Sequence, residues 1–280
     1  MHPQFDPVAI WLGPLPVRWY GLMYLLAFIS FILMGKVQLK NNFRFRGVYK
    51  KDIEDLMIYG IFGVVFGGRL GYIFFYKPFY YFNNPLEIFA VWQGGMSFHG
   101  GLIGVILALL LFTNNRPKFG RRVIKHINRA NFFTRFLMVS DFVAPLVPLG
   151  LMFGRIGNFI NGELYGRIAD PNIIFWAMIF PQSGSLDPRH PSQLYQALGE
   201  GIFLFFILLF VSKFKPKLGV LSSSFLIGYG ILRFITEYFR EPDPFLGFVL
   251  INLSIGQLLC LPMIFFGVLL YYFSSSKHGR

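Results

Sequence analysis

The segment Gly154–Gly166, which reads GRIGNFINGELYG, is the densest group of polar side chains in a largely apolar chain. Arg155, Asn158, Asn161 and Glu163 place hydrogen-bond donors and acceptors within nine residues. The four glycines of the segment allow backbone conformations that other residues avoid, and they let a ligand approach closely. A simple turn would need some of these glycines, but not the arginine, the asparagines and the glutamate as well. The pattern therefore favours a binding or catalytic site.

A second group of ionisable side chains lies further along the chain. Arg233 and Glu237 are four residues apart, so they share one face of a helix with Tyr229. One interpretation is an internal ion pair that pins the helix. The other is a cationic site for a phosphate, in which Glu237 orients the guanidinium, because arginine makes two parallel hydrogen bonds to phosphate oxygens. Both interpretations stay open at this point.

Three more ionisable residues lie in or beside apolar stretches. His99 is either a simple interfacial residue or a proton acceptor, because imidazole titrates near neutral pH. Gly100, Gly101 and Gly104, which follow it, indicate close helix packing. Arg69 either extends toward the membrane surface or belongs to a polar site. Glu200 needs a partner that the sequence does not identify.

Other catalytic classes lack support in the sequence. No His-Glu-x-x-His or Cys-x-x-Cys motif and no cluster of carboxylates suggests a metal site. Gly-x-Ser-x-Gly and the phosphate-binding loop Gly-x-x-x-x-Gly-Lys are also absent. Cys260, the one cysteine, lies in an apolar run and is expected to be a packed core thiol. We therefore expect neither a metal nor a cofactor.

The composition indicates what must position these residues. Of 280 residues, 55% are hydrophobic and only 14% are charged, whereas soluble proteins carry roughly 25% charged residues. With 36 phenylalanines and one cysteine, the chain is neither disordered nor a disulfide scaffold. Several apolar stretches reach the roughly 20 residues that span a bilayer. The sequence predicts an all-α polytopic membrane protein.

Seven apolar spans are predicted, and residues 1–280 are expected to form a single transmembrane domain. The spans lie near 19–35, 57–76, 98–113, 138–153, 194–212, 219–236 and 250–273. The fourth is the weakest, because Asp141, Pro145 and Pro148 interrupt it. The longest connection, about 154–193, is expected to be a periplasmic insertion, in which the apolar piece Ile173–Pro181 forms a helix in the membrane interface.

The basic residues predict the orientation of the spans. Eighteen of the 26 lysines and arginines fall in the connections 36–51, 116–135 and 213–217 and in the C-terminal tail, all on one side of the predicted membrane. The positive-inside rule places that side, and the C-terminus, in the cytoplasm and the N-terminus outside. The net charge of +13 is thereby explained without nucleic acid as a partner. The polar candidates then gather near the outer side.

The motifs that carry these candidates resemble those of a known family. Residues 154–166 match the signature Gly-Arg-x-Gly-Asn-Phe-x-Asn-x-Glu-x-x-Gly of bacterial prolipoprotein diacylglyceryl transferases at every fixed position. Four further blocks match in order and spacing: Trp19–Gly21, Ser97–Gly101, His190–Tyr195 and Arg233–Asp243. The resemblance covers nearly the whole chain.

This resemblance implies a fold, a location and a reaction. The fold would have seven transmembrane helices in the bacterial inner membrane, with the N-terminus in the periplasm. The reaction would transfer the diacylglyceryl group of phosphatidylglycerol to the lipobox cysteine of a preprolipoprotein signal peptide, releasing glycerol 1-phosphate. Arg155 and Arg233 would be the essential arginines. The other site residues would be Tyr20, His99, Asn158, Glu163, Gly166, Tyr229 and Glu237.

The residue types suit this chemistry. A thiol attacks the glyceryl carbon, so removal of its proton and stabilisation of the departing phosphate both help. Two arginines can stabilise the departing charge. His99 is the first choice as proton acceptor, with Glu163 or Glu237 as alternatives, although His99 could equally bind the headgroup. The competing class is a transporter or channel for an anionic solute, which the absence of an internal repeat disfavours.

Overall fold

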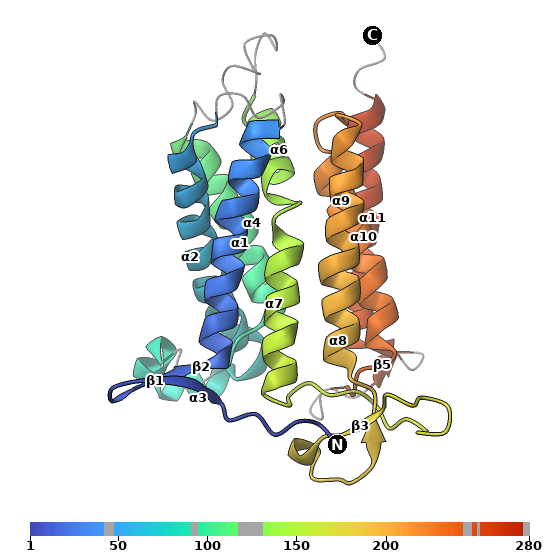
Figure 1. The fold of residues 1–280 in the computed structure, drawn as a ribbon. Coiled ribbons are helices and arrows are strands. Elements are labelled where there is room, and N and C mark those ends of the chain that lie inside the picture. The colour runs from blue at the N-terminus through green and yellow to red at the C-terminus, as the bar shows by residue number, and fades with distance from the viewer. Residues whose placement is uncertain (42–47, 91–94, 117–130, 243–247, 251–252, 277–280) are drawn as a thin grey trace. The chain divides into compact units, whose positions relative to one another are not determined.

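The computed structural model describes residues 1–41, 48–90, 95–116, 131–242, 248–250 and 253–276, and long helices make up most of them (Figure 1). The chain divides into two compact units. The first unit contains residues 1–33 and 141–280, and the second contains residues 34–140. The described residues are thus predominantly helical, as predicted, and they include three short two-stranded sheets that the sequence did not indicate.

The second unit is built on two helices that pack through glycines. These are α2 (Lys50–Tyr76) and α4 (Phe98–Asn115). A Cβ on Gly63 would lie 2.7 Å from the carbonyl oxygen of Gly104, and one on Gly71 would lie 2.6 Å from the Cα of Gly100. Because only hydrogen fits at these positions, the two backbones approach closely. The close packing predicted for Gly100, Gly101 and Gly104 is confirmed at Gly100 and Gly104 but is wrong at Gly101, where a Cβ would come no nearer than 3.7 Å to Val64. Two short helices follow α2: α3 (Pro78–Asn83) and η2 (Pro85–Phe89).

The first unit begins with a hairpin of β1 (Val8–Leu12) and β2 (Leu15–Arg18), which leads into α1 (Trp19–Asn41). The first half of α1 packs on α7 (Val147–Ile160). A Cβ on Gly157 of α7 would lie 2.9 Å from the Tyr20 ring, so this glycine lets the tyrosine rest on the α7 backbone.

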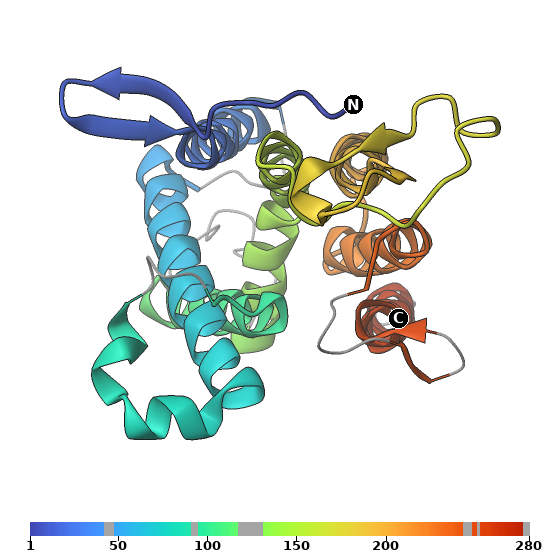
Figure 2. The ribbon, with the colours of Figure 1, turned by 90° about the horizontal axis from the view of Figure 1, so that it is seen from below.

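A long helical run follows and packs against two more helices. The run consists of α8 (Ser192–Gln196), the π-helical segment η5 (Ala197–Phe203) and α9 (Leu204–Lys213). α10 (Val220–Glu237) and α11 (Ile255–Ser276) lie side by side, as Figure 2 shows. A short hairpin of β5 (Phe248–Leu250) and β6 (Leu253–Ser254) precedes α11. Leu204, Leu208 and Tyr229 form the apolar core between the run and α10.

A buried carboxylate fixes the start of α10. Asp141 is fully buried near the end of α6 (Phe132–Val143). It accepts hydrogen bonds from the backbone N–H groups of Gly219 and Ser222, at 2.8 and 2.9 Å, and from the Ser222 hydroxyl at 2.6 Å. The first turn of a helix has backbone N–H groups without helical partners and a partial positive charge, and a carboxylate satisfies both. This role explains an aspartate within an apolar segment.

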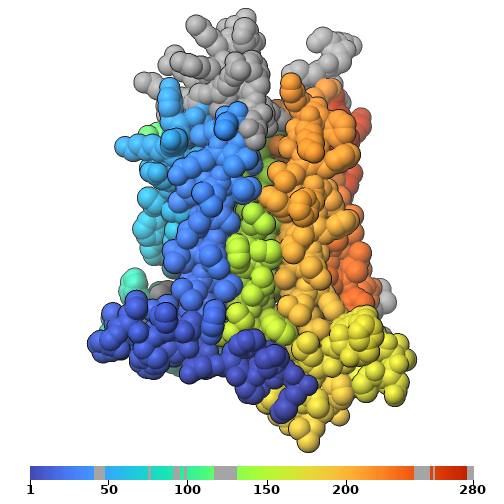
Figure 3. All heavy atoms as spheres, in the orientation of Figure 1, coloured from blue at the N-terminus to red at the C-terminus, as the bar shows by residue number. Residues whose placement is uncertain are grey.

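The first residues of the chain pack against the segment between α7 and α8. This segment contains a small sheet of β3 (Met178–Ile179) and β4 (Pro188–Arg189) and the single turn η4 (Pro181–Ser183). The His2 ring stacks on Phe180, its Nε2 donates to the Phe159 carbonyl oxygen at 2.7 Å, and its backbone N–H donates to Ile179. Figure 3 shows these first residues packed against the segment. The helix predicted over Ile173–Pro181 is wrong, since turns and β3 occupy this range.

In the described part of the chain, four helices are long and apolar enough to cross a membrane: Trp19–Lys40, Lys50–Phe74, Ser192–Lys213 and Gly256–Ser275. Phe132–Val143 and Val147–Ile160 form a pair bent by 47°, which is the interruption predicted at Asp141 and the prolines. A shorter apolar helix covers Gly100–Asn115. Because α7 continues to Ile160, the connection begins later than the predicted 154, and Arg155 lies on a helix. The chain is a helical membrane protein.

Candidate active site

A fully buried carboxylate joins the two arginines that the sequence singled out. One Glu200 oxygen, Oε2, lies 3.4 Å from Arg155 Nη2, and the other, Oε1, lies 3.3 Å from Arg233 Nη1. The Thr236 hydroxyl also donates to Glu200 Oε1, at 3.0 Å. The partner that Glu200 requires inside an apolar helix is therefore a pair of guanidinium groups from two other helices.

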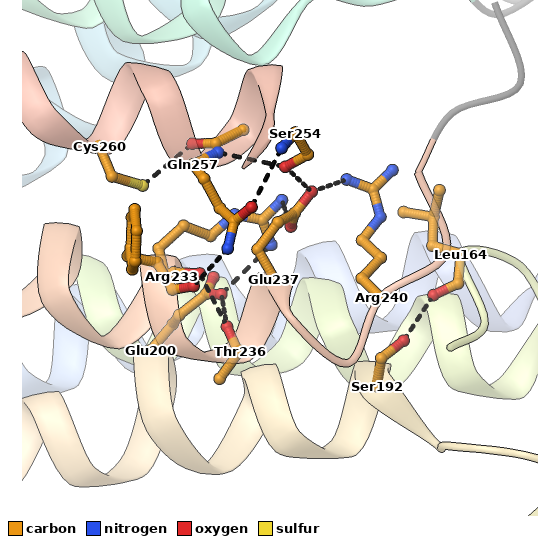
Figure 4. Close-up of polar contacts among 12 residues, drawn as sticks. Leu164, Ser192, Glu200, Arg233, Thr236, Glu237, Arg240, Ser254, Gln257 and Cys260 are labelled. Carbon is orange, nitrogen blue, oxygen red and sulfur yellow. Dashed lines mark hydrogen bonds and ion pairs between the residues drawn. The ribbon is translucent and has the colours of Figure 1, made fainter. Parts of the chain in front are cut away.

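The network continues from Arg233 along α10. Arg233 Nη2 lies 2.8 Å from Glu237 Oε2, as the four-residue spacing predicts. Glu237 Oε1 accepts from Arg240 Nη1 and from the Ser254 hydroxyl, each at 3.3 Å. Figure 4 shows these side chains pointing toward one another from α10 and the segment after it, from the helical run, and from β6 directly before α11. Two carboxylates thus hold three arginines.

Close helix packing brings the network together. Arg155 lies on α7, Glu200 on η5 and Arg233 on α10. A Cβ on Gly201 would lie 2.5 Å from Cβ of Met152, so the residue next to Glu200 has to be small for η5 to approach α7. A π-helical segment at this place also fits a functional site, because such segments occur often there.

The network carries excess positive charge and is partly open. Its three guanidinium groups and two carboxylates sum to one positive charge when all are ionised. The Arg155 and Arg233 side chains retain 14% and 11% exposure, whereas Glu200 retains none. In the described part of the chain, Arg155 makes its only side-chain hydrogen bond to Glu200, although a guanidinium has five N–H donors. The site can therefore accept an anion.

Asn158 and Glu163 form a polar turn after α7. Asn158 Nδ2 donates to Glu163 Oε1 at 2.8 Å, and the backbone N–H of Glu163 donates to the Asn158 carbonyl oxygen at 3.0 Å. Gln193 Nε2, at the start of α8, donates to the Glu163 carbonyl oxygen at 2.7 Å. The polar residues of the glycine-rich segment therefore fix the path of the chain from α7 to α8.

Gly166 lies where three backbone segments meet. Its N–H donates to the His190 carbonyl oxygen at 2.9 Å, and it forms an antiparallel bridge with Arg240. A Cβ at this position would meet the carbonyl oxygens of both His190 and Phe239. Glycine is therefore required for packing, and through Arg240 this crossing is connected with the network.

Tyr20 and Tyr229, the two tyrosines predicted to belong to the site, have different surroundings. Tyr20 packs its ring against Gly157, the residue before Asn158. Tyr229 retains 2% exposure and lies one helical turn before Arg233 on α10, with its ring stacked on Phe225. The structure thus places Tyr20 beside α7 and Tyr229 in the apolar core beneath the arginines.

His99 and Arg69 belong to the second unit. The His99 side chain lies outside the described residues, so only its position in the first turn of α4 is known. Arg69 is buried and donates to the backbone carbonyl oxygens of Glu87, Ile88 and Gly95, at 2.5, 2.9 and 3.3 Å. These bonds give Arg69 a structural role in shaping the segment after α2.

Another histidine titrates below its ordinary range. His190 opens the motif His-Pro-Ser-Gln before α8, and burial lowers its pKa. Its Nδ1 lies 3.1 Å from the Tyr195 hydroxyl, whose oxygen also accepts from Trp176 Nε1 at 2.6 Å. A neutral imidazole that accepts from this hydroxyl fits the lowered pKa. Among the described residues, no three His, Cys, Asp or Glu side chains are grouped to hold a metal.

The central position of Glu200, and the contributions of Thr236, Arg240, Ser254 and Gln257, were not predicted from the sequence. Glu200 carried a signal, because an acid inside an apolar span needs a cationic partner. Gln257 and Ser254 bond to each other at the start of α11, where Gln257 Oε1 accepts from the Ser254 N–H at 3.0 Å. These two residues have no such signal, since the sequence does not reveal which helices meet.

Comparison with known proteins identifies the family of the chain. A family model described as "Prolipoprotein diacylglyceryl transferase" matches residues 7–273. The chain is 54% identical over 278 residues to the phosphatidylglycerol--prolipoprotein diacylglyceryl transferase of Dechloromonas aromatica, covering 99% of this chain and 98% of that protein. It is 52% identical over 278 residues to the enzyme of that name from Methylibium petroleiphilum, covering 99% of both chains. The chain therefore belongs to the prolipoprotein diacylglyceryl transferase family.

Proposed function

We propose that this protein transfers the diacylglyceryl group of phosphatidylglycerol to the cysteine thiol of a preprolipoprotein lipobox, the first step of lipoprotein maturation. The observation that carries the proposal is the shared anchoring of Arg155 and Arg233 on Glu200. One carboxylate holds both guanidinium groups, each bound to a different oxygen of it. They are thus arranged to act on one small anion, such as the phosphate diester of a lipid headgroup.

The reaction breaks the bond between a glyceryl carbon and a phosphate oxygen. The substrate thiolate attacks that carbon and forms a thioether, while both electrons of the broken bond leave with glycerol 1-phosphate. Negative charge grows on the departing phosphate, and Arg155 and Arg233 stabilise it by hydrogen bonds. A preorganised network matters here, because arginines fixed by Glu200 and Glu237 need no rearrangement as the charge develops.

The thiol proton has to leave before or during the attack. A free thiol of pKa ~8.5 is only a few per cent thiolate at neutral pH. Glu237 is bound by Arg233 and Arg240. Glu163 accepts a hydrogen bond from the amide of Asn158. His99 remains the first choice as proton acceptor, with Glu163 or Glu237 as alternatives.

The other predicted site residues take binding roles in this proposal. Asn158 orders the turn beside Arg155, and Gly166 supports Arg240 at the backbone crossing. Tyr20 packs on α7 at Gly157, two residues after Arg155, and Tyr229 lies one helical turn before Arg233 on α10. Arg155, Asn158, Gly166, Tyr20 and Tyr229, with Arg233, would then form the surface that holds phosphatidylglycerol. No cofactor is required, since the nucleophile belongs to the substrate.

The distribution of basic residues supports seven spans in the cytoplasmic membrane of a bacterium, with the N-terminus in the periplasm. The spans other than the four long helices would be the bent pair, α4 and α10. The whole chain would be one transmembrane domain with a periplasmic insertion, which begins after Ile160. The network at the end of α10 would then lie near the periplasmic surface.

A reaction with purified protein tests the proposal. Phosphatidylglycerol and a peptide with a lipobox cysteine are incubated with the protein in detergent, and mass spectrometry follows the peptide. The proposal predicts one diacylglyceryl adduct for each glycerol 1-phosphate released. A folded protein that yields neither product contradicts it. The alternative, an anion transporter or channel, predicts flux of anions from proteoliposomes instead.

A further inference from the structure

The face of the helical run that meets α7 and α10 is polar rather than apolar. Ser192, Gln193, Gln196 and Glu200 are all fully buried. Three of them bond to described residues: Ser192 to the Leu164 carbonyl oxygen at 2.9 Å, Gln193 to the Glu163 carbonyl oxygen at 2.7 Å, and Glu200 to the two arginines. The fourth, Gln196, lies between them in sequence and one turn before Glu200.

Gln196 lacks hydrogen-bond partners among the described residues. Neither its amide nitrogen nor its amide oxygen has a hydrogen-bond partner, and Gln193 Oε1 also has none. Buried polar atoms almost always have hydrogen-bond partners, so an amide with two unpaired atoms indicates a partner from outside the described residues. Gln193 and Gln196 are three residues apart, so these atoms lie on one side of α8.

The chemistry of an amide limits what the absent partner can be. A primary amide offers both donors and an acceptor and carries no charge. A hydroxyl group is a donor and an acceptor as well, so two neighbouring hydroxyls can satisfy the amide completely. An ammonium group has donors only, and it would lie beside the arginines without a carboxylate left for it. A polyol therefore fits this position better than an amine.

The distance along the helix matches a polyol attached to the phosphate. Gln196 precedes Glu200 by four residues, or about 6 Å along a helix axis. Glu200 marks the position of the arginine pair, so Gln196 lies about one headgroup length from the phosphate site. The segment η5 begins at Ala197, so the helix widens directly after Gln196.

We propose that Gln196 binds the hydroxyl groups of the glycerol headgroup of phosphatidylglycerol, and so determines which lipid the enzyme accepts. This inference rests on the proposed function, because it places the lipid phosphate on Arg155 and Arg233. Gln193 Oε1 accepts from the same headgroup. The Gln196 side chain is fully buried, so this binding requires its neighbours to move apart when the lipid enters.

Binding of two phosphate monoesters tests the proposal without requiring transfer. Glycerol 1-phosphate and propyl phosphate differ only in two hydroxyls, and isothermal titration measures their affinities for the protein in detergent. The wild type is expected to bind glycerol 1-phosphate about tenfold more tightly, the effect of one or two hydrogen bonds. Equal binding of the two esters by the wild type, or binding of neither, overturns the proposal, whatever the variants do.

The variant Gln196→Met removes both polar atoms and keeps the length of an unbranched side chain. It is expected to bind the two esters equally and to lose the preference for phosphatidylglycerol over phosphatidylpropanol in kcat/KM. Ser212→Ala is the matched control, since Ser212 lies at the other end of the same helical run and donates to Leu209. An unchanged preference, or an equal loss on both lipids, overturns the proposal and indicates a packing role or a buried water.

A failure of the proposed function would look different. Wild-type protein that binds glycerol 1-phosphate with this preference but yields no lipidated peptide would contradict the transferase proposal alone. Wild-type protein that yields lipidated peptide from phosphatidylglycerol and phosphatidylpropanol equally well would contradict the headgroup proposal alone.

Discussion

Glu200 shows how one buried side chain can organise a site. Charges inside a membrane are costly, and they are retained where they pair and serve function. Glu200 binds Arg155 and Arg233 through separate oxygens, and Thr236 supports one of these oxygens. The carboxylate thereby offsets the repulsion between two guanidinium groups and leaves their remaining donors for a substrate.

Replacing Glu200 by glutamine tests this arrangement. Glu200→Gln keeps the shape but removes the charge, so the arginines repel each other and their positions are no longer fixed. We expect at least about a tenfold loss in transfer rate and a lower melting temperature, because breaking a buried ion pair costs about 3–5 kcal/mol. Thr236→Val, which removes one hydrogen bond and leaves both ion pairs, should cost only about 1 kcal/mol. A Glu200→Gln enzyme with wild-type rate and stability contradicts this role.

His2 predicts a pH dependence for the N-terminal residues. Burial lowers the pKa of His2 below its ordinary value of 6.5, so the undocked histidine binds a proton more readily than the docked one. Docking is therefore fully favoured above about pH 6.5 and weakens as the pH falls below it. A spin label on Gln4, in a Cys260→Ala background, should become more mobile on acidification. His2→Phe should abolish this response, and a label equally immobile at pH 7.5 and pH 5 contradicts the assignment.

At the scale of elements, the helix ends and breaks are explained by a few side chains. Asp141 at the end of α6 caps α10, and Pro145 lies in the break between α6 and α7. The sequence predicted the break, because proline and aspartate interrupt an apolar run. It did not predict the cap, because the partner of Asp141 is 78 residues away at Gly219.

Loss of this cap should destabilise α10. Asp141→Ala leaves two backbone N–H groups and the Ser222 hydroxyl without their buried acceptor. We expect a loss of about 2 kcal/mol in the free energy of unfolding, measured by titration with a denaturing detergent. Ser223→Ala is the control, because its buried hydroxyl donates within the same turn to Val220. Equal stability of the two variants would show that Asp141 does not stabilise the helix.

At the scale of the whole molecule, composition and motifs predicted much of what the structure and the comparisons support. The apolar stretches predicted helices at 19–35, 57–76 and 194–212, because about 20 apolar residues can only be helical in a bilayer. Arg155, Arg233 and Glu237 were identified because a charged side chain in apolar surroundings needs a partner or has a function. The meeting of Arg155 with Glu200 and the role of Gly201 could not be predicted, since they depend on how separate helices pack.

The orientation of the chain is a whole-molecule prediction. With Cys260 replaced by alanine, a cysteine at Leu186, which is 80% exposed, should react with an impermeant maleimide from the periplasmic side. A cysteine at Lys213, at the end of α9, should react only after the membrane is made permeable. The positive-inside rule is the physical reason. Reaction of both cysteines from the same side would contradict the predicted crossing by Ser192–Lys213.

The most direct test of the central claim is the transfer rate of Arg155→Ala. The claim is that Arg155 and Arg233 together stabilise the departing phosphate of phosphatidylglycerol. Loss of one such group typically costs a factor of about 100 to 1,000 in rate. We therefore expect a protein that folds in detergent but forms the diacylglyceryl adduct at least about 100-fold more slowly than the wild type. A folded Arg155→Ala protein with near-normal turnover would remove Arg155 from the mechanism and contradict the account.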